Sequence, residues 1–118
     1  MIFVALPDFD KDVKRLLKKY KSIADDLETI KSILAVLPYA RPPFSYVIDN
    51  LGVKVLVIKI KKIASKSFYG KGVNSGLRII YTYTLEEGKI IFLELYHKNE
   101  KELEDKKRII NYLKCTKI

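Results

Sequence analysis

The sequence predicts an α+β fold, in which an N-terminal helical hairpin packs on an antiparallel β-sheet and a further helix ends the chain. Two apolar stripes with helical spacing occupy the first third of the chain. The period becomes extended after a proline-rich segment at 38–44, and helical spacing returns near the C-terminus. A chain of 118 residues can bury one hydrophobic core but not two independent ones. We therefore predict a single domain over residues 1–118.

The first predicted elements are a short strand and an amphipathic helix. The strand runs from Ile2 to Leu6 and ends at Pro7, after which Asp8 can cap a helix that extends to about Tyr20. Apolar residues recur on one face of this helix at Phe9, Val13, Leu16, Leu17 and Tyr20. The other face is basic and contains Lys11, Lys14, Arg15, Lys18 and Lys19.

A second helix is predicted between Ser22 and Pro38. Ser22, followed three residues later by Asp25, resembles a capping box, which marks a helix start. The apolar stripe of this helix contains Ile23, Leu27, Ile30, Leu34 and Leu37. Because only one or two residues link the two helices, we expect them to pack antiparallel.

Extended segments rich in Val, Ile, Tyr and Phe follow the proline-rich loop, at 45–48, 53–62, 77–84 and 89–97. Glu86-Glu87-Gly88 closes a tight hairpin between the last two segments, whereas the basic connection 63–76 is long and carries three glycines. Asn99 with Glu102 can cap the last helix. Its apolar positions are Leu103, Ile109, Ile110 and Leu113. We expect the helices to cover one face of the sheet and to leave the other face available for function.

The charge of the chain predicts a polyanionic partner. Lys and Arg number 23 against 14 Asp and Glu, and the net charge of +9 is spread along the sequence. Nucleic acid, an anionic membrane or an acidic protein would each satisfy this charge. The uncharged stretches are only strand-sized and the N-terminus does not resemble a secretory signal, so we expect a soluble cytoplasmic protein without membrane association. Cys115 has no companion ligands, and we predict neither a metal nor another cofactor.

Candidate site residues come from three predicted strands and the basic loop: Lys59, Lys61, Lys66, Lys71, Arg78, Tyr96, His97 and Lys98. Alternation places Lys59 and Lys61 on the same face of one strand, Arg78 begins the next strand, and Tyr96 to Lys98 end the last strand. If these strands pair in sequence order as hairpins, the side chains can converge at one end of the sheet.

This combination suits cleavage of RNA by its own 2′-hydroxyl group. The reaction needs an acceptor for the hydroxyl proton, cations for the charge that gathers on the phosphorane, and an acid for the leaving 5′-oxygen. The planar fork of Arg78 can bind two phosphate oxygens, and Lys59 and Lys61 add point charges. His97 can act as acid or base, and Tyr96 can stack on a base or move a proton.

Structural interpretations of the same residues stay open. Lys59 and Lys61 can be solvated charges on an exposed strand face. His97 can be a structural histidine, and Tyr81 and Tyr83 can serve sheet packing.

The chain as a whole resembles the RelE/ParE superfamily of type II toxins, and is nearer to its RelE and HigB-like branch. The resemblance covers nearly the full length, through the segments FDKDVKRLLKKYKSIADDL, VIKIKK, SKSFYGKGVNSGLRIIYTY and LELYHKNEKEL. The most specific feature is a basic glycine loop that leads into S-G-x-R at a strand start, here Ser75 to Arg78.

The resemblance implies a twisted antiparallel sheet, metal-independent cleavage of mRNA on the ribosome, and neutralisation by a cognate antitoxin. It implies substrate-phosphate roles for Lys59, Lys61 and Arg78, and catalytic or stacking roles for Tyr96 and its neighbours. The chain has His97 where close relatives often have an acidic residue, and Asn99 where the RelE branch commonly has arginine. The acid and base assignments therefore stay open.

Three hypotheses follow for the function. The leading hypothesis is a ribosome-dependent mRNA endonuclease toxin that inhibits translation. The second is a ParE-like inhibitor of DNA gyrase without nuclease activity. The third is a degenerate toxin that only binds RNA or the antitoxin. The ParE branch shares this architecture, so the fold alone does not identify the target.

Overall fold

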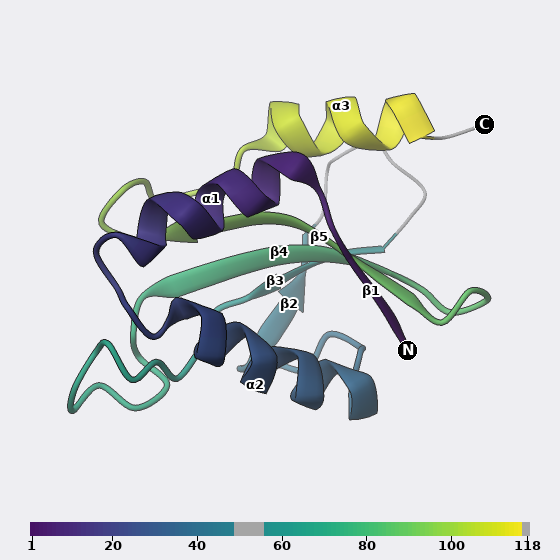
Figure 1. The fold of residues 1–118 in the computed structure, drawn as a ribbon. Helices are drawn as coiled ribbons and strands as arrows, with labels where there is room; N and C mark the ends of the chain where they lie inside the picture. The colour runs from purple at the N-terminus through teal and green to yellow at the C-terminus, as the bar shows by residue number, and fades with distance from the viewer. Residues whose placement is uncertain (49–55, 117–118) are drawn as a thin grey trace.

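The computed structural model describes residues 1–48 and 56–116, and of 115–116 only the backbone. Its elements are β1 (Ile2–Ala5), α1 (Pro7–Leu17), α2 (Ile23–Val36), β2 (Ser45–Val47), β3 (Leu56–Ile60), β4 (Leu77–Thr84), β5 (Lys89–His97) and α3 (Lys106–Thr116). The strands form one sheet in the order β1-β5-β4-β3-β2, with helices on both of its faces (Figure 1). Residues 53–55 of a predicted strand and the side chain of Cys115 lie outside this description.

The predicted antiparallel sheet is confirmed for β2 to β5, which pair in sequence order. β1 instead pairs in parallel with β5, so the sheet is mixed. Sequence order fixes the direction only of strands joined by a hairpin, and β1 is separated from its neighbour by most of the chain. No described helix is both long and apolar enough to cross a membrane.

α1 and α2 cover one face of the sheet and run in opposite directions across it, as predicted (Figure 1). Their apolar stripes supply Phe9, Leu16, Ile23, Ile30 and Leu34 to the larger core. The sheet supplies Ile58, Ile60, Leu77, Ile79, Tyr81, Ile90, Phe92 and Leu95. Packing of these stripes against β-branched and aromatic residues is the main source of stability for helices of this length.

The helix starts differ from those predicted. α1 begins at Pro7, and Asp8 lies in its first turn. The Asp8 carboxylate interacts favourably with the helix dipole there, but it does not cap the helix. Ser22 makes no side-chain cap to α2, because its hydroxyl hydrogen bonds to Asp26 at 2.8 Å. The predicted capping role of Ser22 with Asp25 was therefore wrong.

The prediction that the second face of the sheet is left open was wrong, because α3 covers part of this face. Ile109 and Leu113 of α3 pack on Val57, Ile80, Leu93 and Tyr96. α3 also begins later than predicted, at Lys106, and the side chain of Asp105 accepts the Arg108 N–H at 3.0 Å. The preceding turn is fixed to β5 instead, since Glu94 accepts the Asp105 N–H at 2.9 Å. The end of this face near Lys61 and Arg78 is not covered by α3.

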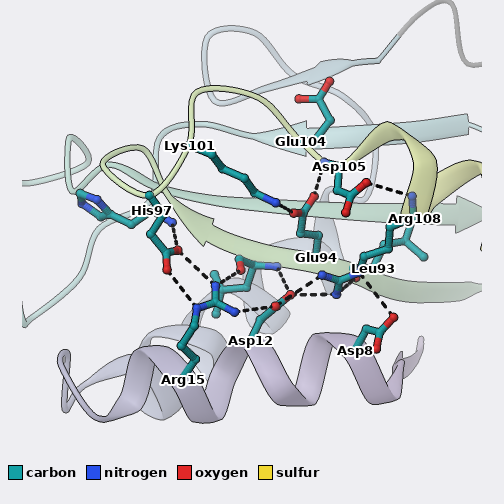
Figure 2. A network of polar contacts seen from close by, with 12 residues as sticks. Asp8, Asp12, Arg15, Leu93, Glu94, His97, Lys101, Glu104, Asp105 and Arg108 are labelled. Atoms are coloured by element: carbon teal, nitrogen blue, oxygen red, sulfur yellow. Dashed lines mark hydrogen bonds and ion pairs between the residues drawn. The ribbon is translucent and has the colours of Figure 1, made fainter.

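Within residues 1–48 and 56–116, the backbone of β5 has no strand partner on one side beyond Phe92, because β1 pairs only with Lys89 to Phe92. Four side chains bond the backbone groups along this edge instead (Figure 2). The contacts are Arg108 to Leu93 O (2.6 Å), Leu95 N to Asp12 (3.0 Å), Arg15 to Leu95 O (3.3 Å) and His97 N to Glu100 (3.0 Å). These side chains replace the missing strand, and buried peptide groups are thereby satisfied.

Asp12 is the centre of this edge network. It is 5% exposed, and it accepts hydrogen bonds from Arg15 at 2.9 Å, Arg108 at 2.8 Å and the Leu95 N–H. A buried carboxylate is tolerated only when its charge is paired and its oxygens are bonded, and both conditions are met here. One side chain of α1 therefore connects that helix to β5 and to α3.

We predict that Asp12→Ala lowers the free energy of unfolding by about 3 kcal/mol or more, because two arginines and a peptide N–H lose their acceptor. The matched control is Asp10→Ala, which removes an exposed carboxylate from the first turn of the same helix and should cost only ~0.5 kcal/mol. Urea unfolding followed by circular dichroism measures both. Equal losses would show that the edge network does not stabilise the fold.

Candidate functional site

A pocket of about 530 Å3 lies at the end of the sheet where β3, β4 and β5 present cationic residues. Its lining residues are Pro43, Tyr46, Lys61, Lys62, Asn74, Gly76, Arg78 and Lys98. Four of these residues are cationic and none is acidic. We call this hollow the cationic pocket. The structure thus brings together Lys61, Arg78 and Lys98 of the predicted site.

Gly76 closes the pocket beside β5. The Lys98 N–H donates to the Gly76 carbonyl at 2.9 Å, which continues the β4–β5 ladder by one bond. Gly76 has φ +90°, and a Cβ at this position would lie 2.7 Å from Nε2 of His97. Ser75 donates its hydroxyl to the Ile63 carbonyl at 2.5 Å. The S-G-x-R motif therefore gives the backbone before β4 a defined conformation, which fixes the position of Arg78 at the strand start.

Arg78 is half-buried and partly oriented by the backbone. Its Nη1 donates to the carbonyls of Lys61 at 3.1 Å and Leu77 at 3.2 Å. Its other guanidinium nitrogens bond nothing within residues 1–48 and 56–114, so that part of the fork is free for a phosphate. A preoriented guanidinium loses less side-chain entropy on binding than a mobile one.

Tyr96 and His97 are neighbours in β5 and therefore point to opposite faces of the sheet, and a β-bulge before them decides which face each one takes. Ile80 pairs with Glu94 but Tyr81 pairs with Phe92, so the residue between them is extra. Tyr96 pairs with Arg78 on the face covered by α3, whereas His97 lies on the face covered by α1 and α2. Of the three predicted residues at the end of this strand, only Lys98 lines the cationic pocket.

His97 is 3% exposed and both of its ring nitrogens are engaged. Nδ1 accepts the Asn99 N–H at 3.1 Å, so Nε2 carries the proton and donates to the Ser75 carbonyl at 2.9 Å. The ring stacks on Phe68, with centroids 5.0 Å apart, and on Tyr20 at 5.7 Å. His97 therefore holds the backbone at Ser75 and Gly76 in place through its hydrogen bond to the Ser75 carbonyl.

Tyr96 is fully buried, and its hydroxyl has no hydrogen-bond partner among the described residues. The ammonium groups of Lys59 and Lys101 lie 5.8 Å and 5.2 Å from its ring centroid. Burial raises the pKa of Tyr96, and the nearby Lys59 charge offsets this only in part. The phenol therefore stays protonated at neutral pH and supports the Arg78 backbone from the neighbouring strand.

Lys59 lies on the same face as Lys61, as predicted, but its charge is already paired. Its Nζ lies 3.0 Å from a carboxylate oxygen of Glu104, and the two side chains are 13% and 7% exposed. Burial raises the pKa of Glu104, but hydrogen bonds from its own backbone and from Lys59 outweigh burial, so the net shift is downward. Burial lowers the pKa of Lys59, and contacts with Tyr96 and Glu104 reverse this to a net rise.

The basic loop 63–76 is anchored to the start of α2. The Ser65 hydroxyl donates to Asp26 at 2.5 Å, and Ser67 exchanges hydrogen bonds with Ser22 through backbone and hydroxyl groups. Lys66 and Lys71 on this loop are exposed and lie outside the cationic pocket. Their predicted role in RNA binding stays a prediction.

Apart from Gly76 of the S-G-x-R motif, sequence reasoning missed four lining residues of the pocket, Pro43, Tyr46, Lys62 and Asn74. Lys62 donates to the Asn74 side chain at 3.0 Å, which joins the end of β3 to the basic loop. The run Lys-Ile-Lys-Lys at 59–62 could have indicated Lys62. β3 ends at Ile60, so the alternation of side chains does not extend to Lys62 and does not place it on the face opposite Lys61. Tyr46 had no local signal, since its position depends on the pairing of β2 with β3.

Tyr81 and Tyr83 serve packing, which agrees with the structural interpretation of their sequence pattern. Tyr81 is buried and donates to the Pro38 carbonyl at 2.7 Å, and Tyr83 packs edge-on against Tyr39. Among the described residues no three His, Cys, Asp or Glu side chains form a group that could hold a metal ion.

No family model and no curated protein sequence matches the chain. Among solved structures, the chain is similar to one described as an archaeal RelE-RelB complex from Pyrococcus horikoshii OT3. The match has a TM-score of 0.56 and 16% sequence identity, and it covers 85% of this chain and 97% of the other. The chain therefore has a RelE-like fold, in agreement with the predicted α+β class.

We predict that Gly76→Ala lowers the free energy of unfolding by more than about 2 kcal/mol, because it adds a clash with a stacked, buried imidazole to the cost of a left-handed backbone. Gly72→Ala is the matched control. Gly72 also has a positive φ, of +56°, but nothing lies within 4 Å of its Cβ position, so only the backbone cost of ~1 kcal/mol applies. Chemical denaturation measures the difference, and equal losses would refute the close approach.

We also predict an acid-dependent contribution from the Lys59–Glu104 pair. Because the folded pKa of Glu104 lies below its ordinary 4.5, the pair stabilises the fold above that pH and loses its effect as pH falls through the folded pKa. Glu104→Gln should therefore be less stable than wild type at pH 7 and lose less stability on acidification. Urea titrations at pH 7 and at successive steps below about 4.5 test this. Parallel pH profiles for the two proteins would contradict it.

Proposed function

We propose that this protein is the toxin of a type II toxin–antitoxin system and that it cleaves mRNA on the ribosome without a metal ion. The observation that supports this most is the cationic pocket, in which cations at the ends of three strands meet around an oriented arginine and none of the described lining residues is acidic. Such a pocket suits a phosphodiester. The RelE-like fold, and the description of its solved neighbour as a RelE-RelB complex, point to the same class.

In the proposed reaction the 2′-oxygen of a ribose attacks the adjacent phosphorus, and the bond to the 5′-oxygen of the next nucleotide breaks. The products are a 2′,3′-cyclic phosphate and a free 5′-hydroxyl. Arg78, Lys61 and Lys98 stabilise the charge on the phosphorane. The 2′-hydroxyl proton passes to solvent water, and an exposed lysine ammonium can donate the proton that the leaving 5′-oxygen takes. Tyr96 and His97 are assigned as positioning residues, because one is buried under α3 and the other uses both ring nitrogens.

The proposed cellular partner is a cognate antitoxin with an acidic or amphipathic segment. A domain with a net charge of +9 attracts such a segment, and neutralising the cationic pocket would block substrate entry. Interactions between exposed charges are screened by salt and act over a distance. We therefore expect this attraction to affect the association rate constant of the antitoxin more than its dissociation rate constant.

We predict that Arg78→Ala slows mRNA cleavage about 100-fold or more, the usual effect of removing one preorganised donor to a transition-state oxyanion. Mapping of RNA ends after induction measures this, together with relief of growth arrest. Arg41→Ala is the matched control, because Arg41 is exposed, contacts the Phe44 ring at 4.9 Å and lies outside the cationic pocket. Arg78→Lys, which keeps the charge but not the fork, should give an intermediate rate.

Intact messages during full growth arrest by the wild-type protein would contradict the nuclease proposal. If gyrase cleavage complexes accumulated in those cells, the chain would instead act as a gyrase inhibitor. If growth were unaffected while binding of RNA or the acidic partner persisted, the chain would be a binding module.

A further inference from the structure

A second hollow, of about 340 Å3, adjoins the cationic pocket. It is lined by Tyr46, Val47, Ile48, Lys59, Lys61, Leu103, Glu104 and Lys106, and we call it the side hollow. Tyr46 and Lys61 line both hollows. These two residues therefore form the boundary between them, and a chain molecule bound in one hollow can continue into the other.

The two hollows differ in chemistry. The cationic pocket has four cations and no acid, whereas the side hollow has three apolar side chains, Val47, Ile48 and Leu103. Its Lys59 is neutralised by Glu104, 3.0 Å away. Besides the Lys59–Glu104 pair, the second hollow keeps only Lys61 and Lys106 as cations among its described lining residues, so a phosphate is favoured less there than among the four cations of the first. A flat, uncharged group with an apolar face, such as a nucleobase, suits the second.

Tyr46 is placed to bind such a group. It lies on the edge strand β2, opposite Lys59 of β3, and it belongs to neither hydrophobic core. The residue is 39% exposed, although it is a large aromatic residue within a strand. The Lys61 ammonium lies 5.6 Å from the ring centroid, a cation–π contact that orients the ring at the boundary.

We infer that Tyr46 is a base-stacking residue, and that the side hollow receives the nucleobase next to the phosphate held in the cationic pocket. The ligand class is single-stranded RNA, whose unpaired bases stack on aromatic side chains. This inference rests on the proposed function, because it assumes that the cationic pocket holds an RNA phosphate. It adds a contact to the base, which the phosphate-binding residues cannot make.

Equilibrium binding of two probes by the purified full chain tests this inference. One probe is a 2′-O-methyl hexaribonucleotide, which cannot be cleaved, and the other is the same backbone with every base removed. Both are measured by fluorescence anisotropy at one fixed, low salt concentration. We expect the wild-type protein to bind the probe with bases about tenfold more tightly, the effect of one stacked base.

Tyr46→Ala should remove this preference, with a Kd about tenfold higher for the probe with bases and no change for the abasic probe. Tyr46→Phe keeps the ring and should bind like wild type. Tyr39→Ala is the matched control, because Tyr39 is also exposed but packs against Tyr83 outside both hollows. It should leave both affinities unchanged.

Equal affinity of the wild-type protein for the two probes would overturn the inference without any variant. An equal effect of Tyr46→Ala on both probes would overturn it as well. Arg78→Ala separates this outcome from failure of the proposed function, since it should weaken both probes equally. If Arg78→Ala has no effect, the phosphate site itself fails; if only Tyr46→Ala has none, the stacking role alone fails.

Discussion

The structure depends on how the unpaired edge of β5 is satisfied. Beyond Phe92 no described strand pairs with it on one side, and Asp12, with two arginines and a glutamate, bonds its peptide groups instead. Without these bonds the strand end would leave buried donors and acceptors unpaired, which costs more than the bonds themselves contribute. The same strand end carries the ladder bond from Lys98 to Gly76. The edge network therefore supports the cationic pocket from the far side of the strand.

The β-bulge in β5 decides which side chains can meet a substrate. Strict alternation through Leu93 to Lys98 would place Glu94 and Tyr96 on the same face as Phe92. The bulge instead directs Leu93 and Tyr96 toward α3 and returns Leu95 to the core under α1 and α2. As a result, Tyr96 is buried under α3 and His97 under α1 and α2, so neither side chain with proton-transfer chemistry lines the cationic pocket. The pocket is left with guanidinium and ammonium groups as its charged residues, which favours electrostatic stabilisation over a dedicated acid–base pair.

Periodicity was sufficient to predict the existence and order of the helices, the strands and the hairpin, although not the helix starts. Each of these elements depends mainly on residues that are close together in the sequence. It also predicted that Lys61, Arg78 and Lys98 meet, since adjacent antiparallel strands share an end. It could not predict the parallel pairing of β1, the burial of Tyr96 under α3, or the ion pair of Lys59 with Glu104. Each of these depends on contacts between residues distant in sequence, and no local pattern encodes them.

Net charge alone does not distinguish the pocket from the rest of this basic surface. The exposed lysines of α1 share their helix with Asp8 and Asp10, and Lys59 is matched by Glu104, so a phosphate gains little at either place. At the cationic pocket four cations share a hollow, and no carboxylate belongs to the part of its lining that the structure describes. Charges of one sign in a concave, partly desolvated site reinforce one another at a bound anion. The arrangement that excludes acidic residues from this hollow, more than the count of basic ones, makes it a site.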